Sequence, residues 1–123
     1  MAQFIQINAG SVEAIAELNS TGVAKAIWEA LPITAESSLW GDEVYFPIPV
    51  YTELEGGKSV VNIGDLGYWP TRNAFCIFFG PTPVSRGDEI RAASAVNIIG
   101  KVSGDPKAFL KVKDGAKITL EKA

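Results

Sequence analysis

Apolar and polar residues alternate in short stretches along this chain, and turn-forming residues separate the stretches. Ile5 and Ile7 alternate with polar neighbours, and the alternation resumes over Val12–Leu18 after the turn Ala9-Gly10-Ser11. A period of two is the spacing of a β-strand with one buried face, and a glycine-containing break between two such strands is typical of a hairpin. The pattern predicts an opening hairpin and a mainly β fold.

The run AFCIFF, residues 74–79, is apolar at every position, so we expect it to be the central strand, buried on both faces. In the segment 44–50, four apolar residues share one face while Pro47 and Pro49 lie on the other. Because proline cannot donate to a β-ladder, that strand is expected to be bent, bulged or at an edge. Further strands are predicted at 60–63, at 90–102 and around Ile118 and Leu120.

Helical spacing occurs once, at Val23, Ile27, Ala30 and Leu31. It predicts a helix over Thr21 to Ala30, capped by Asn19 or Ser20 and ended by Pro32. The pair Asp105-Pro106 has the order of an N-cap followed by a first-turn proline, which predicts a second short helix. About eight strands and two short helices suit a small closed β-barrel whose interior is filled by side chains, with the first helix over one mouth.

Composition limits the possible functions of this domain. The length of 123 residues, with 47% hydrophobic and 20% charged residues, indicates one globular domain spanning 1–123. A net charge of −3 gives no general attraction to nucleic acid or to a membrane surface. The chain has no histidine and one cysteine, which excludes histidine-dependent catalytic triads, histidine zinc sites and an internal disulfide. We expect a cytoplasmic protein without a signal peptide, membrane span, metal or cofactor.

Carboxylates and the cysteine are candidates for chemistry. Asp42, Asp65 and Asp88 each follow a glycine at intervals of 23 residues, which could gather ligands for a hard cation but is better explained by three turns. Glu43, Asp65, Asp88 and Glu89 could supply an acid–base pair, although the sequence brings no two of them together. Cys76 lies in the most apolar run and is expected to be buried and unreactive.

The stretch Gly64 to Pro83 contains the strongest candidate binding residues, most of them in a connection just before the central strand. Trp69 offers a flat apolar face, and Arg72 offers five donors suited to a carboxylate, phosphate or carbonyl oxygen. The predicted binding residues for a small molecule or peptide are Tyr68, Trp69, Arg72 and Phe75, with Tyr45 and Trp40 in second rank. The alternative is that Tyr68 and Trp69 plug the barrel mouth and that Arg72 is solvated.

Four segments carry a family resemblance: residues 40–50 (WGDEVYFPIPV), 64–70 (GDLGYWP), 73–83 (NAFCIFFGPTP) and 93–102 (ASAVNIIGKV). In order and spacing they resemble the uncharacterised cyclophilin-like family of bacteria and archaea, over nearly the whole chain. The resemblance implies a small closed β-barrel capped by a helix. It brings no assigned activity.

Segments 64–70 and 72–77 are also similar to the two segments that line the proline-binding face of true cyclophilins, which are peptidyl-prolyl isomerases. The catalytic arginine of that family precedes both segments, but no arginine precedes Arg72, and the pocket histidine has no counterpart. The resemblance therefore implies the fold without isomerase activity. We expect a non-enzymatic binding module. The alternatives are a divergent isomerase, in which Arg72 or Arg91 replaces the missing arginine, and a structural or regulatory homo-oligomer.

Overall fold

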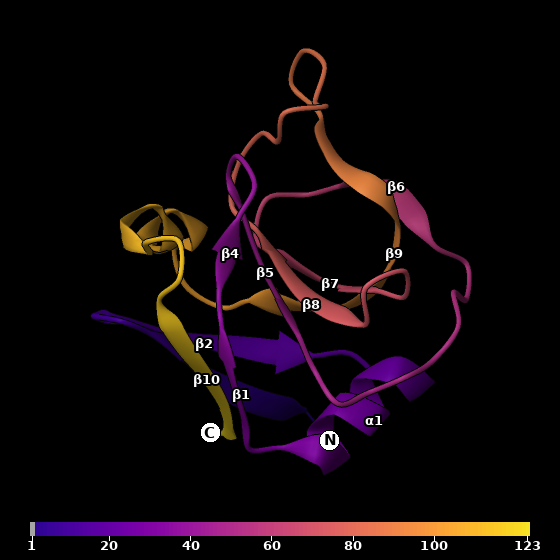
Figure 1. Ribbon diagram of the computed structural model, residues 1–123. Coiled ribbons are helices and arrows are strands. Elements are labelled where there is room, and N and C mark those ends of the chain that lie inside the picture. Colours follow the sequence, from indigo (N-terminus) through magenta and orange to yellow (C-terminus); the bar gives the residue numbers. More distant parts are fainter. Residues whose placement is uncertain (1) are drawn as a thin grey trace.

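The computed structural model describes residues 2–123, which fold into a mainly β structure with one α-helix and one 3-10 helix (Figure 1). The strands are β1 (Gln3–Ala9), β2 (Val12–Leu18), β3 (Ile33–Glu36), β4 (Ser38–Leu39), β5 (Glu43–Pro47), β6 (Lys58–Val61), β7 (Asp65–Trp69), β8 (Ala74–Phe78), β9 (Ile90–Val102) and β10 (Lys117–Lys122). The helices are α1 (Gly22–Ala30) and η1 (Pro106–Lys111). No helix within residues 2–123 has the length and apolar character needed to cross a membrane.

The predicted opening hairpin is confirmed. β1 pairs with β2 from Gln3↔Leu18 to Ala9↔Val12, and Gly10 occupies the turn with a φ of 61°. Ile5 and Ile7 are both completely buried. Because alternate residues of a strand point to opposite faces, this burial places the apolar set of the hairpin in the core.

Both helices begin close to their predicted positions. The N-cap of α1 is Thr21, whose hydroxyl accepts from the Ala24 N–H at 3.2 Å, and not Asn19 or Ser20. Asn19 has another role, since its side chain accepts from Thr21 N and donates to the Ile98 carbonyl in β9. Asp105 caps η1 as expected. In Figure 1, α1 lies across one end of the structure, and its buried residues belong to the main core.

Within residues 2–123, hydrogen bonds do not close the sheet into a ring, unlike the closed barrel expected from the sequence. The strand order is β3-β10-β1-β2-β9-β7-β8-β5-β4, with β6 attached only to β9. The two end strands, β3 and β4, are joined by Ser37 alone. Ser37 N donates to the Ala116 carbonyl at 2.9 Å, and Gly115 N donates to the Ser37 carbonyl at 2.8 Å. The chain itself therefore passes from one end of the sheet to the other.

Two buried clusters lie on opposite faces of β5, β7 and β8. The main core includes Val44, Phe46, Tyr68, Phe75 and Ile77. The second core lies on the other face and comprises Val61, Cys76, Phe78, Ile90, Ala92 and Val96. Every residue of β8 is buried, which confirms the central strand predicted from its apolar run. β9 contributes to both clusters, because its C-terminal part pairs with β2 and β7 while its N-terminal part pairs with β6.

Candidate binding pocket

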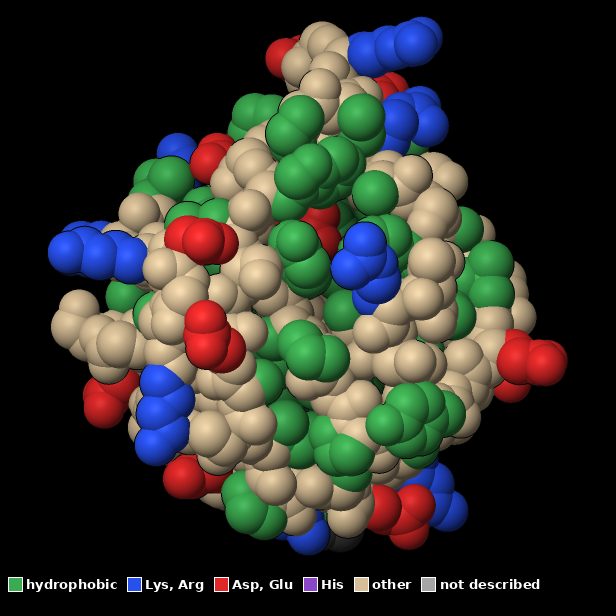
Figure 2. All heavy atoms as spheres, viewed as in Figure 1, with side chains coloured by type: hydrophobic (Ala, Val, Ile, Leu, Met, Phe, Trp, Pro, Cys, Tyr) green, Lys and Arg blue, Asp and Glu red, His purple; other side chains and the backbone are tan. Residues whose placement is uncertain are grey.

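A pocket of about 230 Å³ opens beside the second core. Its walls are Trp40, Glu43, Tyr45, Trp69 and Arg72 on one side and Ala92, Ala93, Ser94 and Val96 of β9 on the other. Figure 2 shows a hollow of this composition, in which acidic atoms lie recessed between hydrophobic side chains and a basic side chain stands near the rim. The pocket thus combines aromatic surface with one acidic and one basic group.

The pocket forms where β9 separates from β7. The two strands pair from Asp65↔Lys101 to Tyr68↔Asn97 and no further. On its other side, β9 pairs with β6 at Val96 and again at Arg91, so residues 92–95 have no partner in either ladder. Trp69 spans the resulting gap, since its indole Nε1 donates to the Ser94 hydroxyl at 2.6 Å. Strand separation therefore opens the pocket, and this bond joins its two sides.

Trp69 and Arg72 are held by a tight turn between β7 and β8. Arg72 N and Asn73 N donate to the carbonyls of Trp69 and Pro70, and Asn73 has a positive φ of 49°, a conformation that asparagine tolerates better than most residues. The Tyr45 ring meets the Trp69 ring edge to face, with centroids 6.2 Å apart. Arg72 Cζ lies 6.0 Å from the Trp69 centroid, at the outer limit of a cation–π contact.

Glu43 supplies the acidic group and is only 4% exposed. Its Oε1 atom is buried and has no hydrogen-bond partner among residues 2–123. Burial raises the pKa of this carboxyl to about 7, and a hydrogen bond with the Cys76 thiol lowers it by a smaller amount. Near neutral pH both protonation states are therefore present, so that the group can donate as well as accept.

Cys76 lies behind the pocket, in β8 opposite Tyr45. It is completely buried, as the sequence predicted. Burial and the negative charge of Glu43 raise the pKa of the thiol well above its usual value. A thiol in this state is a weak nucleophile, because the thiolate is the reactive form.

The turn that follows Trp40 packs against the loop between β8 and β9. The turn before β5 contains Gly41, with a φ of 59°, and a Cβ there would lie 2.8 Å from Pro83 Cδ. Asp42 N donates to the Pro81 carbonyl at 2.9 Å. Glycine at position 41 therefore permits a close packing that places Trp40 at the pocket wall.

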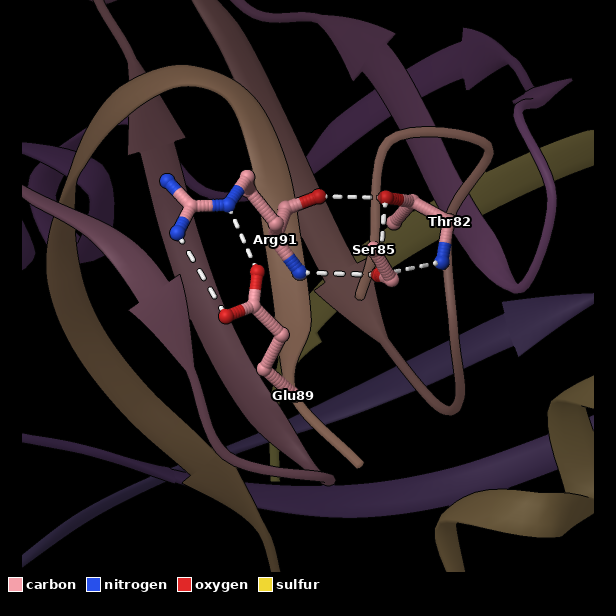
Figure 3. Close-up of polar contacts among 4 residues, drawn as sticks. All are labelled: Thr82, Ser85, Glu89 and Arg91. Carbon is pink, nitrogen blue, oxygen red and sulfur yellow. Dashed lines mark hydrogen bonds and ion pairs between the residues drawn. The ribbon is translucent and has the colours of Figure 1, made fainter. Parts of the chain in front are cut away.

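The same loop is tied to the start of β9 by hydroxyl groups (Figure 3). Ser85 Oγ accepts from Thr82 N at 2.9 Å and from Arg91 N at 3.0 Å, and the Thr82 hydroxyl donates to the Arg91 carbonyl. The Arg91 guanidinium pairs with Glu89 at 2.6 Å, which lowers the pKa of Glu89 and raises that of Arg91. Arg91 thus anchors this region and is not part of the pocket wall.

The structure brings together four of the six residues proposed from the sequence: Trp40, Tyr45, Trp69 and Arg72. It places Tyr68 and Phe75 in the main core, on the opposite face, each with no exposed surface. Tyr68 is a structural anchor there, because its hydroxyl donates to the Val50 carbonyl at 2.6 Å and accepts from Asn73 Nδ2 at 2.9 Å. Strand alternation explains this separation, because neighbouring residues of a strand point to opposite faces. Tyr68 therefore faces away from Trp69, and Phe75 faces away from Cys76.

Sequence reasoning considered Glu43 only as one of several carboxylates and missed its place in the pocket. The available signal was its position two residues before Tyr45, on the same strand face. The three glycine–aspartate pairs do not gather: no cluster suited to a metal ion occurs within residues 2–123. Asp65 closes a turn instead, accepting from Asn62 N at 2.8 Å.

Comparisons with known proteins show the family. The cyclophilin-like family model matches residues 3–121, so this chain belongs to the cyclophilin-like family. It is similar to a hypothetical protein from Archaeoglobus fulgidus whose solution structure is known, with 39% sequence identity and a TM-score of 0.83. The similarity covers 99% of this chain and 95% of the archaeal one. The comparison with curated proteins finds no match.

Proposed function

We propose that this protein is a non-enzymatic module that binds a small molecule bearing an anionic or carbonyl group in the pocket beside Trp69. The observation that carries the proposal is the presence, in one pocket, of aromatic walls, a buried carboxyl oxygen without a hydrogen-bond partner and a guanidinium without a carboxylate partner in the described part of the chain. Glu43 Oε1 accepts no hydrogen bond within residues 2–123. The one ion pair within those residues joins Arg91 and Glu89, so Arg72 has no carboxylate partner there.

The geometry supports binding of a compact ligand. A pocket of about 230 Å³ is below the usual range of roughly 300–1,000 Å³ for drug-sized ligands. Trp69 is held by Ser94 and Tyr45, so little conformational freedom is lost when its ring contacts a ligand. Arg72 is exposed at the rim, where its guanidinium can bind an oxygen of the ligand through two parallel hydrogen bonds.

Another depression is larger but fits a ligand less well. Its volume is about 600 Å³, and it lies between the ends of β1 and β2 and the start of α1, lined by Gln3, Glu17, Asn19 and Thr21 among others. It is more open to solvent, and the side chains of Asn19 and Thr21 already hydrogen-bond to each other and to the backbone. Their polar groups are therefore less available for a ligand.

A fragment screen tests this proposal. Carboxylate- and carbonyl-bearing fragments are added to the protein, and binding is followed by chemical-shift changes and titration calorimetry. The Trp69→Ala variant should bind about 30-fold more weakly, the loss of roughly 2 kcal/mol typical of an anchoring aromatic residue. Arg72→Ala should weaken binding selectively for anionic fragments.

Trp28→Ala is the matched control. Trp28 is also half-buried but lies in α1, where Lys122 Nζ is 4.9 Å from its ring centroid. The Trp28→Ala variant should leave the affinity for the fragments unchanged. The proposal fails if no fragment shifts the resonances of the pocket residues, or if Trp69→Ala and Arg72→Ala bind all fragments as well as the wild type does.

A further inference from the structure

We infer that the ligand of this pocket is a planar lactam-type nitrogen heterocycle, whose adjacent ring N–H and C=O groups pair with the carboxyl group of Glu43. The inference rests on the proposed binding function and specifies the chemistry of the ligand. It identifies Glu43 as the residue that determines specificity, with the aromatic side chains as the walls and Arg72 as the group at the mouth.

The first argument is the unsatisfied acceptor. Buried polar atoms in folded proteins nearly always have a hydrogen-bond partner, and Glu43 Oε1 has none within residues 2–123 although the side chain lines the pocket. Because Oε1 has almost no exposed surface, a ligand N–H group satisfies it only when the carboxyl group turns this oxygen toward the pocket. A hydrocarbon or a ligand with acceptors alone would leave the atom unpaired.

The second argument is the charge around the carboxyl. The groups that face it are Cys76 from β8, Tyr45 from its own strand and Arg72 from the turn after β7. Arg72 forms no ion pair with it, and the β9 wall contributes Ala92, Ala93, Ser94 and Val96, which carry no charge. No cation therefore holds the group ionised, and burial raises its pKa to about 7.

A neutral carboxyl group presents one O–H donor beside one acceptor oxygen. A lactam edge presents the complementary pair, an N–H beside a C=O, so the two can form parallel hydrogen bonds in one plane. An ionised carboxylate matches a different edge, one with two N–H donors. The protonation state of Glu43 thus distinguishes these two classes of ligand, and burial raises the share of the neutral form that the lactam edge matches.

The third argument is the shape and composition of the walls. Trp69 and Tyr45 meet edge to face at 6.2 Å, and the Trp69 Nε1 atom is already engaged by Ser94. The indole therefore offers apolar surface to the pocket, against which a flat ring can stack. A volume of about 230 Å³ holds one such ring with a small substituent. A carboxylate substituent would reach the exposed Arg72.

Calorimetric titration with three probes tests the inference: uracil, 1,3-dimethyluracil and orotate. Uracil should bind, and its dimethyl derivative, which lacks the N–H groups, should bind at least tenfold more weakly. Orotate should bind more tightly than uracil in the wild type, and Arg72→Ala should remove that advantage. Affinity for uracil should fall about tenfold from pH 5.5 to pH 8, because only about a tenth of Glu43 stays protonated at pH 8 if its pKa is near 7.

Two substitutions of Glu43 separate recognition from simple packing. Glu43→Gln keeps an adjacent donor and acceptor without titrating, so uracil should still bind and the pH dependence should disappear. Glu43→Leu fills the site without polar groups and should reduce uracil binding at least tenfold. The thermal unfolding temperature of each variant shows that it is folded.

The inference is overturned if both Glu43 variants bind uracil like the wild type, or if uracil binds more tightly at pH 8 than at pH 5.5. It is also overturned if other fragments bind in the pocket while none of the three probes does, and Trp69→Ala weakens those fragments. In that case the binding function stands and only the ligand class is wrong. If no fragment of any class binds in the pocket, the proposed function fails as well.

Discussion

The two faces of β5, β7 and β8 differ in how completely their polar groups are satisfied. On the main-core face, the one polar aromatic, Tyr68, forms hydrogen bonds with Val50, Asn73 and Thr52. On the opposite face, Glu43 is almost as deeply buried, yet its Oε1 atom has no partner within residues 2–123. The same three strands thus support one face on which the buried polar group is fully hydrogen-bonded and one face on which a buried polar atom has no partner among the described residues.

The difference follows from what covers each face. The rest of the sheet and α1 enclose the main core. The second face is covered by β6, the beginning of β9 and the loop that contains Thr82 and Ser85. Because β9 pairs with β7 only from Asn97 onward, the cover before that residue is incomplete and the pocket opens. A shared strand can therefore serve stability through one face and binding through the other.

The largest expected effect comes from truncating an aromatic residue on each face. Phe75→Ala should lower the free energy of unfolding by roughly 3–5 kcal/mol, because it empties a fully buried aromatic site. Trp69→Ala should cost about half as much or less, since Trp69 is half-buried and removes less surface from water. Urea denaturation monitored by circular dichroism measures both. Equal losses would show that Trp69 is a structural plug, which would contradict the proposed contrast between the faces.

The second effect is a dependence of stability on pH through Glu43. Its pKa is about 7 in the folded protein, above the ordinary value of 4.5. Between these values the folded state binds the proton and the unfolded state does not. Stability should therefore fall by about 3 kcal/mol as the pH rises from 4.5 through 7, and should level off above about pH 8.

Glu43→Gln checks the source of this effect. It cannot titrate, so its stability should be flatter than that of the wild type across the same range. Urea denaturation at several pH values measures both proteins. A wild-type profile that rises with pH between 4.5 and 7 would show that the Glu43 carboxylate is stabilised in the fold, contrary to its burial.

A smaller effect is expected at Tyr68, the satisfied polar group of the main core. Tyr68→Phe removes the hydroxyl that donates to the Val50 carbonyl. It should cost about 1–3 kcal/mol, the penalty for leaving a buried acceptor unpaired. Ligand affinity should stay unchanged, because Tyr68 faces away from the pocket. A loss of affinity without a loss of stability would place Tyr68 in the binding function instead.

The smallest effect concerns Cys76. Cys76→Ala should destabilise the fold by roughly 1 kcal/mol or somewhat more, as a small large-to-small change in a buried cluster. The native thiol should react slowly with a thiol reagent, since burial raises its pKa and blocks access. Comparison with labelling in denaturant provides the reference. Rapid stoichiometric labelling of the native protein would show that the second core opens readily.

Much of the fold could be predicted because local sequence patterns specify many of its strands and helices. The alternation at Ile5 and Ile7, the apolar run of residues 74–79 and the Asp105-Pro106 helix start each depend on neighbours in the chain. The cyclophilin-like fold was also predicted from four segments and is confirmed by the family match. The closed ring of hydrogen bonds was not found within residues 2–123, because the two end strands, β3 and β4, follow one another through Ser37 and pair with β10 and β5 instead of with each other.

The candidate site was predicted less completely, and two different reasons apply. Tyr68 and Phe75 were grouped with Trp69 by nearness in the sequence, although strand alternation points them to the opposite face. Glu43 was underrated because an acidic residue is usually exposed. It lines the pocket together with Ala92 and Val96, about 50 residues further along the chain.

Residue type and spacing were enough to predict most of the secondary structure, the family, and the aromatic and basic character of the binding candidates, because these depend on local patterns. Which candidates meet in one pocket, and that Glu43 lies there with a raised pKa, depends on the fold. Desolvation and pocket shape involve segments that are distant in the chain. β9 covers one part of the β5–β7–β8 face and leaves another open, and no local pattern records where the strands separate.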